Sequence, residues 1–120
     1  MAEYTDKQRI IQELVPGKQI TLAHIIANPD EILYKKLGLD PAVEYSKSAI
    51  GILTLSPAET AIIASDIARK SSGAQLGFVD RFSGTVIITG TFSEVDASLR
   101  AVTQYAEETL GFSVCKITKT

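Results

Sequence analysis

The 120-residue sequence has very few of the side chains that build disulfide, metal or catalytic sites. It contains one cysteine, Cys115, one histidine, His24, and no tryptophan. A single cysteine excludes a disulfide within the chain and is typical of a protein in the reducing cytoplasm. A metal site needs several histidine, cysteine or carboxylate ligands, so we interpret His24 as a hydrogen-bonded structural residue. We interpret Cys115 as a small buried side chain and expect no metal and no cofactor.

Charge of one sign and long apolar runs are also lacking. The formal net charge is -2 and the basic residues are scattered, which argues against a nucleic-acid partner. No apolar run approaches the roughly 20 residues of a membrane span, and the polar residues 1–9 show no signal peptide. With 45% apolar residues, the chain has ordinary globular composition and a length that supports one domain.

Catalytic motifs are missing as well. The sequence has neither a GxGxxG nor a P-loop, and no serine stands on a nucleophile elbow. No acid–base pair or nucleophile is arranged for chemistry, so we expect a protein that is not an enzyme.

What the sequence does contain is a regular succession of strand and helix patterns. An apolar strand at 49–55 precedes an alanine-rich helix with a start signal at 56–59. Strands at 74–82 and 85–91 form a hairpin around Ser83-Gly84. A helix capped at 93–96 and a strand at 112–118 complete a βαββαβ order. The predicted fold class is therefore α+β with a ferredoxin-like core.

Two further elements are expected before this core. Branched apolar residues predict a strand at 20–26. Asn28, Pro29 and Glu31 form a capping pattern for a short helix whose inner face we expect to be Ile32, Leu33 and Leu37.

The alanine-rich helix carries small and apolar residues almost all round. This pattern predicts burial on more than one side. We give equal weight to a contact with another molecule and to a helix enclosed by its own sheet and loops. On this helix Asp66 and Lys70 are four residues apart, with the acid first, as in an ordinary surface ion pair.

Residues 10–15 fit two structures equally well by spacing alone. Ile10, Ile11, Leu14 and Val15 suit a turn and a half of helix or a short strand, and Pro16-Gly17 follows as a turn signal.

Several long motifs occur in an order that resembles one protein family. They lie at residues 10–13, 15–19, 21–24, 49–52 and 77–84. The sequence resembles the circularly permuted shell proteins of bacterial microcompartments, from the ethanolamine-, propanediol- and choline-utilisation types. The resemblance implies a ferredoxin-like domain that forms a hexameric tile of a shell in the cytoplasm. It divides the chain into an N-terminal arm, 1–15, and a permuted shell domain, 16–120.

The resemblance also implies roles for particular residues. It places Lys70 at the contact between tiles. It implies that one segment from each of six chains forms a small β-barrel over a central pore. The residues of this segment are Ile10, Ile11, Gln12, Glu13, Leu14 and Val15. It implies a central pore lined by Asp80, Arg81, Phe82, Ser83 and Gly84. Other shell proteins and the targeting peptides of cargo enzymes are the implied partners.

A second function stays open from the residues alone. A ferredoxin-like fold also suits a small-molecule-binding regulator that forms dimers or trimers, although fold is a weak warrant for function. Assembly separates the two hypotheses, because a tile forms hexamers and then sheets or tubes.

Overall fold

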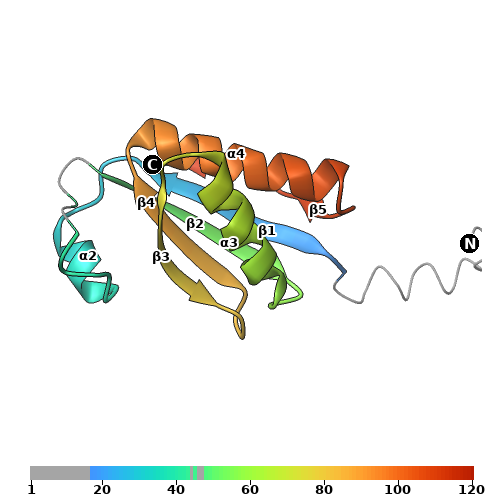
Figure 1. Ribbon diagram of the computed structural model, residues 1–120, viewed down its shortest axis with the longest axis horizontal. Coiled ribbons are helices and arrows are strands. Elements are labelled where there is room, and N and C mark those ends of the chain that lie inside the picture. Colours follow the sequence, from blue (N-terminus) through green and yellow to red (C-terminus); the bar gives the residue numbers. More distant parts are fainter. Residues whose placement is uncertain (1–16, 44, 46–47) are drawn as a thin grey trace, which may run out of the picture.

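The computed structural model describes residues 17–43, 45 and 48–120, which form one six-stranded sheet and three helices (Figure 1). Neighbouring strands follow the order β3-β4-β2-β1-β5. β6 also pairs with β1, further along the same edge of that strand than β5. The elements are β1 Gln19–Ile26, α2 Ile32–Lys36, β2 Ala49–Ser56, α3 Thr60–Ser71, β3 Gln75–Asp80, β4 Thr85–Gly90, α4 Phe92–Glu108, β5 Ser113–Val114 and β6 Thr118–Lys119.

The first strand of the chain lies inside the sheet. β1 pairs antiparallel with β2 and parallel with β5 and β6. The order from β2 to β6 is the predicted βαββαβ core, with β1 inserted between its first strand and its last. The predicted ferredoxin-like α+β fold with an added N-terminal strand and short helix is confirmed.

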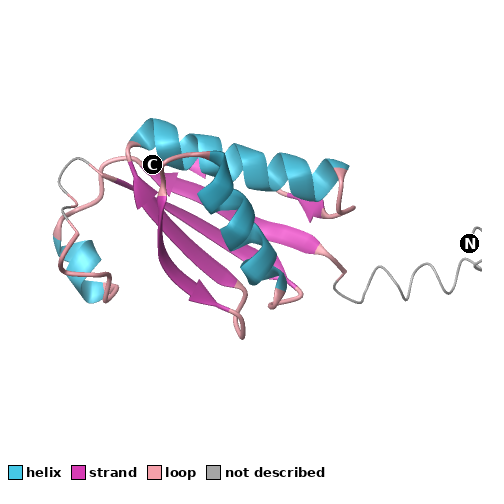
Figure 2. Cartoon of the chain, in the orientation of Figure 1, coloured by secondary structure: helices cyan, strands magenta, loops and turns pink. Residues whose placement is uncertain are grey.

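The sheet has a separate apolar core on each face, because successive strand residues point to opposite sides. α3 and α4 lie across one face (Figure 2) and cover the larger core, which includes Leu53, Val86 and Ile88. On the other face Ile50 and Ile87 form a smaller core with Tyr34 and Leu39.

Helix α4 packs very closely on β2. Its apolar residues at helical spacing, Val95, Leu99 and Val102, are fully buried. A Cβ atom at Gly51 would lie 2.7 Å from a methyl group of Val95, so a larger residue there would push the helix away. We therefore expect Gly51 to set the distance between α4 and the sheet.

The predicted helix starts are wrong in detail. α4 begins at Phe92, and its N-cap is Thr91 rather than Ser93; Thr91 forms a capping box with Glu94. α3 begins at Thr60 without a side-chain cap, because Ser56 is the last residue of β2 and pairs with Gln19.

The short helix α2 also differs from the prediction. Asn28 does not cap it; instead Asp30 Oδ1 accepts a hydrogen bond from the Ile32 backbone N–H at 3.1 Å. Ile32 and Leu37, expected on the inner face, are exposed, and Tyr34 is the buried residue. Tyr34 is buried because its ring stacks on that of Tyr45, with 4.5 Å between the ring centroids, and its hydroxyl donates to the Ser48 carbonyl.

Helix α3 is buried on one side only, so the prediction of burial on several sides is wrong for a single chain. The buried face consists of small residues, and the bulky Ile62 and Ile63 are about half exposed. The small residues lie three and four positions apart, at Ala61, Ala64, Ser65 and Ala68. This spacing brings α3 close to its neighbours and leaves Ile62 and Ile63 outside, while Ile67 is partly buried against the core.

The predicted last strand, 112–118, is divided into β5 and β6. Residues 115–117 between them are not in a strand. β1 has an irregular register against β2 between Ile20 and Leu22, at the level of this interruption. The Cys115 side chain is only partly buried there, contrary to prediction.

Candidate functional site

The most regular polar structure outside the core is the hairpin tip, residues 80–84, between β3 and β4. Asp80 Oδ1 accepts a hydrogen bond from the Phe82 N–H at 2.9 Å, and Asp80 Oδ2 accepts one from the Ser83 hydroxyl at 2.8 Å. The Gly84 N–H donates to the Asp80 carbonyl at 2.8 Å. The tip is therefore a folded turn held by the aspartate that precedes it.

Gly84 ties this tip to the neighbouring strand. Its carbonyl accepts the Leu55 N–H at 2.8 Å, and its φ is +78°, in the region that favours glycine. A Cβ atom at this position would overlap the Leu55 carbonyl oxygen and lie 3.1 Å from Ala58 Cα. Both backbone conformation and space therefore require glycine here.

Hydrogen bonding to the charged carboxylate, chiefly from the Phe82 backbone and then from Ser83, lowers the pKa of Asp80. Because the pKa is lowered, the charged carboxylate stabilises the turn fully at pH values above the usual aspartate pKa. This stabilisation is lost as the pH falls through the lowered pKa. We expect the Phe82 amide resonance to titrate in an NMR pH series below the usual aspartate pKa. Asp80→Asn should abolish that titration, whereas a midpoint at or above the usual value would contradict this prediction.

Arg81 and Phe82 project from the folded tip. The Arg81 guanidinium carbon lies 5.0 Å from the centroid of the Phe82 ring, which fits a cation–π contact, and Phe82 is 80% exposed. In the described part of the chain Arg81 forms no ion pair with Asp80, whose oxygens serve the turn itself. The tip therefore presents a cation and an aromatic ring together.

An apolar surface continues from this tip along α3 and β3. Ile62 and Val79 line a hollow with residues 80–82. Phe78 is 44% exposed, and it belongs to β3, which lies at the edge of the sheet and leaves backbone groups unpaired. We call Ile62, Ile63, Leu76 and Phe82 the β3 edge surface; Phe78 is paired with Ile87 and so points to the other face of the sheet. The sequence analysis did not single out Ile62 or Phe78, although the alanine spacing already places Ile62 outside.

Lys70 lies near the other end of α3. Its Nζ is 2.8 Å from Asp66 Oδ2, so the predicted ion pair is confirmed, and both side chains are mostly exposed. The hydrogen bond and charge of Asp66 raise the pKa of Lys70. Eight residues separate Ile62 from Lys70, which is about 12 Å along a helix. The structure therefore holds the hairpin tip and Lys70 apart at the two ends of α3.

His24 has the structural role expected from the sequence. Its Nδ1 lies 2.6 Å from the Thr118 hydroxyl and its Nε2 lies 2.9 Å from the Thr120 hydroxyl, so it links β1 to the C-terminal strand. Among the described residues no three His, Cys, Asp or Glu side chains are grouped to hold a metal ion. Within the same ranges no helix has both the length and the apolar character needed to cross a membrane. The barrel candidates, residues 10–15, lie outside the described residues.

Comparison with known proteins agrees with this architecture. Residues 49–118 match the family described as the BMC domain. The chain is 55% identical to the bacterial microcompartment shell protein PduU of Salmonella typhimurium over 112 residues, which cover 93% of each chain. It is similar to a structure titled CutR flat hexamer, form 1, with a TM-score of 0.80 and 47% identity over 88% of this chain and 94% of that one. A CutR screw form with a 41.9 Å pitch matches with a TM-score of 0.77 and 47% identity, over 88% of this chain and all of that one.

Proposed function

This chain belongs to the BMC-domain family of bacterial microcompartment shell proteins, and from that membership we propose that six copies form a hexameric tile of such a shell. The observation that carries the proposal is the likeness to a flat hexamer of CutR over 88% of the chain. The proposed role is structural, and the proposed partners are other shell proteins and the targeting peptides of cargo enzymes.

The β3 edge surface supplies a reason for the ring. An exposed sheet edge with half-exposed apolar side chains is a liability in a monomer and is typical of a protein interface. In a ring this surface would meet a different surface of the next copy, which is a head-to-tail contact. Head-to-tail contacts close into rings when the rotation fits.

We place the hairpin tip at the six-fold axis and Lys70 at the outer edge. The separation of these two features along α3 supports this orientation. Six Arg81 side chains about 10 Å apart would repel one another by roughly 0.4 kcal/mol per neighbouring pair in water. Since Asp80 is committed to the turn, the ring of Arg81 should stay hydrated.

The first test of the proposed function is the native mass of the purified protein at moderate salt. A six-chain species is expected, and higher concentrations should give sheets or tubes. A monomer, dimer or trimer at every concentration would contradict the hexamer. A melting temperature that rises with a small molecule would then favour the ligand-binding regulator, because a ligand that binds the native state stabilises it.

We further propose that residues 10–15 of six chains form a small β-barrel that closes the pore. Six strands leave little interior space beyond what their side chains fill, and closure removes exposed strand edges. Deleting residues 1–15 should therefore leave the hexamer mass unchanged and open the axis. Native mass spectrometry and an axial section of the hexamer by electron cryo-microscopy measure the two effects, and loss of the hexamer would contradict the prediction.

A further inference from the structure

The C-terminal end of α3 has no cap of its own. The last carbonyl groups of a helix lack partners within the helix. Ser72, the C-cap residue, has an extended backbone rather than the left-handed turn that often satisfies them. Two serine hydroxyls reach the Ala68 carbonyl instead, and the first belongs to another helix: Ser98 of α4 donates to it at 3.0 Å. The Ser71 hydroxyl reaches the same carbonyl at 3.1 Å.

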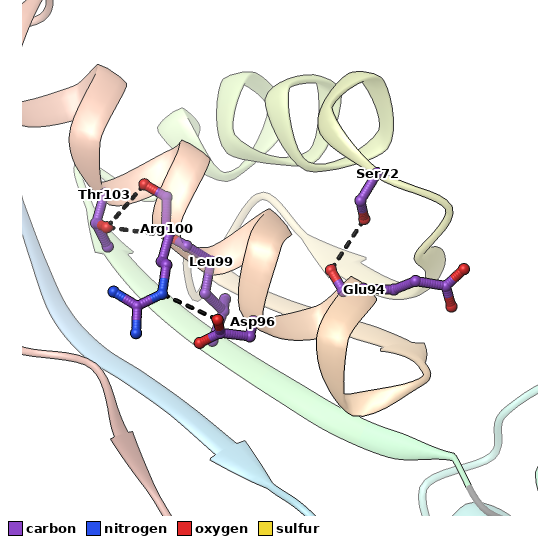
Figure 3. Close-up of polar contacts among 6 residues, drawn as sticks. All are labelled: Ser72, Glu94, Asp96, Leu99, Arg100 and Thr103. Carbon is purple, nitrogen blue, oxygen red and sulfur yellow. Dashed lines mark hydrogen bonds and ion pairs between the residues drawn. The ribbon is translucent and has the colours of Figure 1, made fainter.

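A second serine extends this cap into the following loop. Ser72 Oγ lies 2.8 Å from Ser98 Oγ and 2.9 Å from the Glu94 carbonyl oxygen, the latter contact being drawn in Figure 3. It also accepts the Ala74 N–H at 3.1 Å. Each hydroxyl has one proton. The three contacts, Ser98 to Ala68, Ser72 to Glu94 and Ser72 to Ser98, therefore have two donated protons between them. Ser72 and Ser98 therefore form one hydrogen-bonded unit between α3 and α4.

Burial makes this unit rigid. Ser98 is completely buried, and the described residues include no buried side-chain polar atom without a partner. Loss of the Ser98 hydroxyl would remove one of the two side-chain donors to the Ala68 carbonyl and would break the contact between Ser98 and Ser72. On the other side of the loop, Arg69 Nη1 donates to the Ala74 carbonyl at 2.8 Å. Residues 69–74 are thus fixed from both helices.

Lys70 stands on this fixed turn. Its own side chain is 75% exposed, so the cap fixes the backbone from which Lys70 starts, while its ammonium, paired with Asp66 on the same helix, stays at the surface. An edge contact between two identical tiles across a two-fold axis uses the same residue from both sides. A change in the direction of this turn would then occur in both tiles, and both changes would add to the angle between them.

We infer that Ser98 is a positioning residue for the tile edge, acting through Ser72 and the last turn of α3 to set the direction of Lys70. This inference rests on the proposed function of the chain as a shell tile. It concerns Ser98, which is completely buried between the two helices, and Ser72, which is partly exposed.

The test replaces the capping hydroxyl and measures assembly separately from folding. Ser98→Ala should keep the hexamer mass and should raise the protein concentration needed for sheets about tenfold, or change flat sheets into curved ones. Hydrogen exchange at the Ala74 amide should be faster. Ser72→Ala, at a partly exposed site, should shift both measurements in the same direction and serves as the second variant should Ser98→Ala fail to fold.

The matched control is Val102→Ala, a buried truncation one turn further along α4 that leaves the cap intact. It should lower the melting temperature without changing sheet formation or Ala74 exchange. The inference is wrong if Ser98→Ala and Ser72→Ala form sheets like the parent protein, or if Val102→Ala impairs them equally at the same loss of melting temperature. A parent protein that forms hexamers but never sheets would instead overturn the proposed tile edge, and this inference with it.

Discussion

Replacing Gly84 with alanine is expected to lower the free energy of unfolding by roughly 1.5–3.5 kcal/mol. A positive φ costs a residue with a Cβ about 1–2 kcal/mol. The new Cβ would also overlap the Leu55 carbonyl oxygen, so the tip must move and its hydrogen bond from the Leu55 N–H is lost, at about 0.5–1.5 kcal/mol. Urea denaturation monitored by circular dichroism measures the difference.

Gly111→Ala separates the two causes. Gly111 has a φ of +75°, close to that of Gly84, but a Cβ there would meet nothing within 4 Å. This control should therefore show only the conformational part, about 1–2 kcal/mol. Because the displaced tip lies at the proposed ring axis, Gly84→Ala should also weaken the hexamer, which dilution followed by native mass spectrometry would reveal. Equal losses of stability and equal hexamer masses for both variants would refute the role given to the Leu55 contact.

Lys70→Ala is expected to leave the hexamer intact and to abolish extended sheets. At the proposed tile edge, two-fold symmetry would bring two Lys70 side chains from neighbouring tiles close together. The long side chain covers surface with its methylene groups, and its charge is balanced by Asp66 on the same helix. Negative-stain electron microscopy over a concentration series measures sheet formation, and native mass spectrometry verifies the ring.

The charge balance has its own consequence. Asp66→Asn should weaken the sheets because two unbalanced ammonium groups then face each other, and added salt should restore assembly by screening them. The Asp96–Arg100 pair on α4 has the same spacing and a separation of 2.9 Å, which makes Asp96→Asn a matched control (Figure 3). Sheets that form as readily with Lys70→Ala as with the parent protein would remove Lys70 from the tile edge.

The sequence predicted those parts of the fold whose signals are local and do not compete. The hairpin at Ser83-Gly84 is one example, since strand alternation and a turn dipeptide agree there. The apolar stripe of α4 is another, and its buried residues are those with helical spacing. Membership of the shell protein family followed from long motifs, and the comparisons confirm it.

The errors have two sources: a local signal that was overlooked at the start of α4, and tertiary contacts elsewhere. Both Thr91 and Ser93 suit an N-cap, and only Thr91 is placed three residues before Glu94, where the capping box closes. Tyr34 displaced Ile32 and Leu37 from the inside of α2 through contacts with Tyr45 and Ser48, which no periodicity shows. The Ser98 cap joins residues 30 positions apart and has no sequence signal of its own.

The position of β1 within the sheet has a consequence for how the chain folds during synthesis. β1 is made early, yet its partners β5 and β6 are made last, and the His24–Thr118 contact spans 94 residues. Strand pairs this far apart in sequence form slowly, because a long loop must close before the contact stabilises it. Until the ribosome has released the last strand, β1 can pair with β2 alone and its other edge stays open. The nascent chain therefore carries an exposed strand edge until β5 and β6 have been made, and during that period it is most exposed to aggregation.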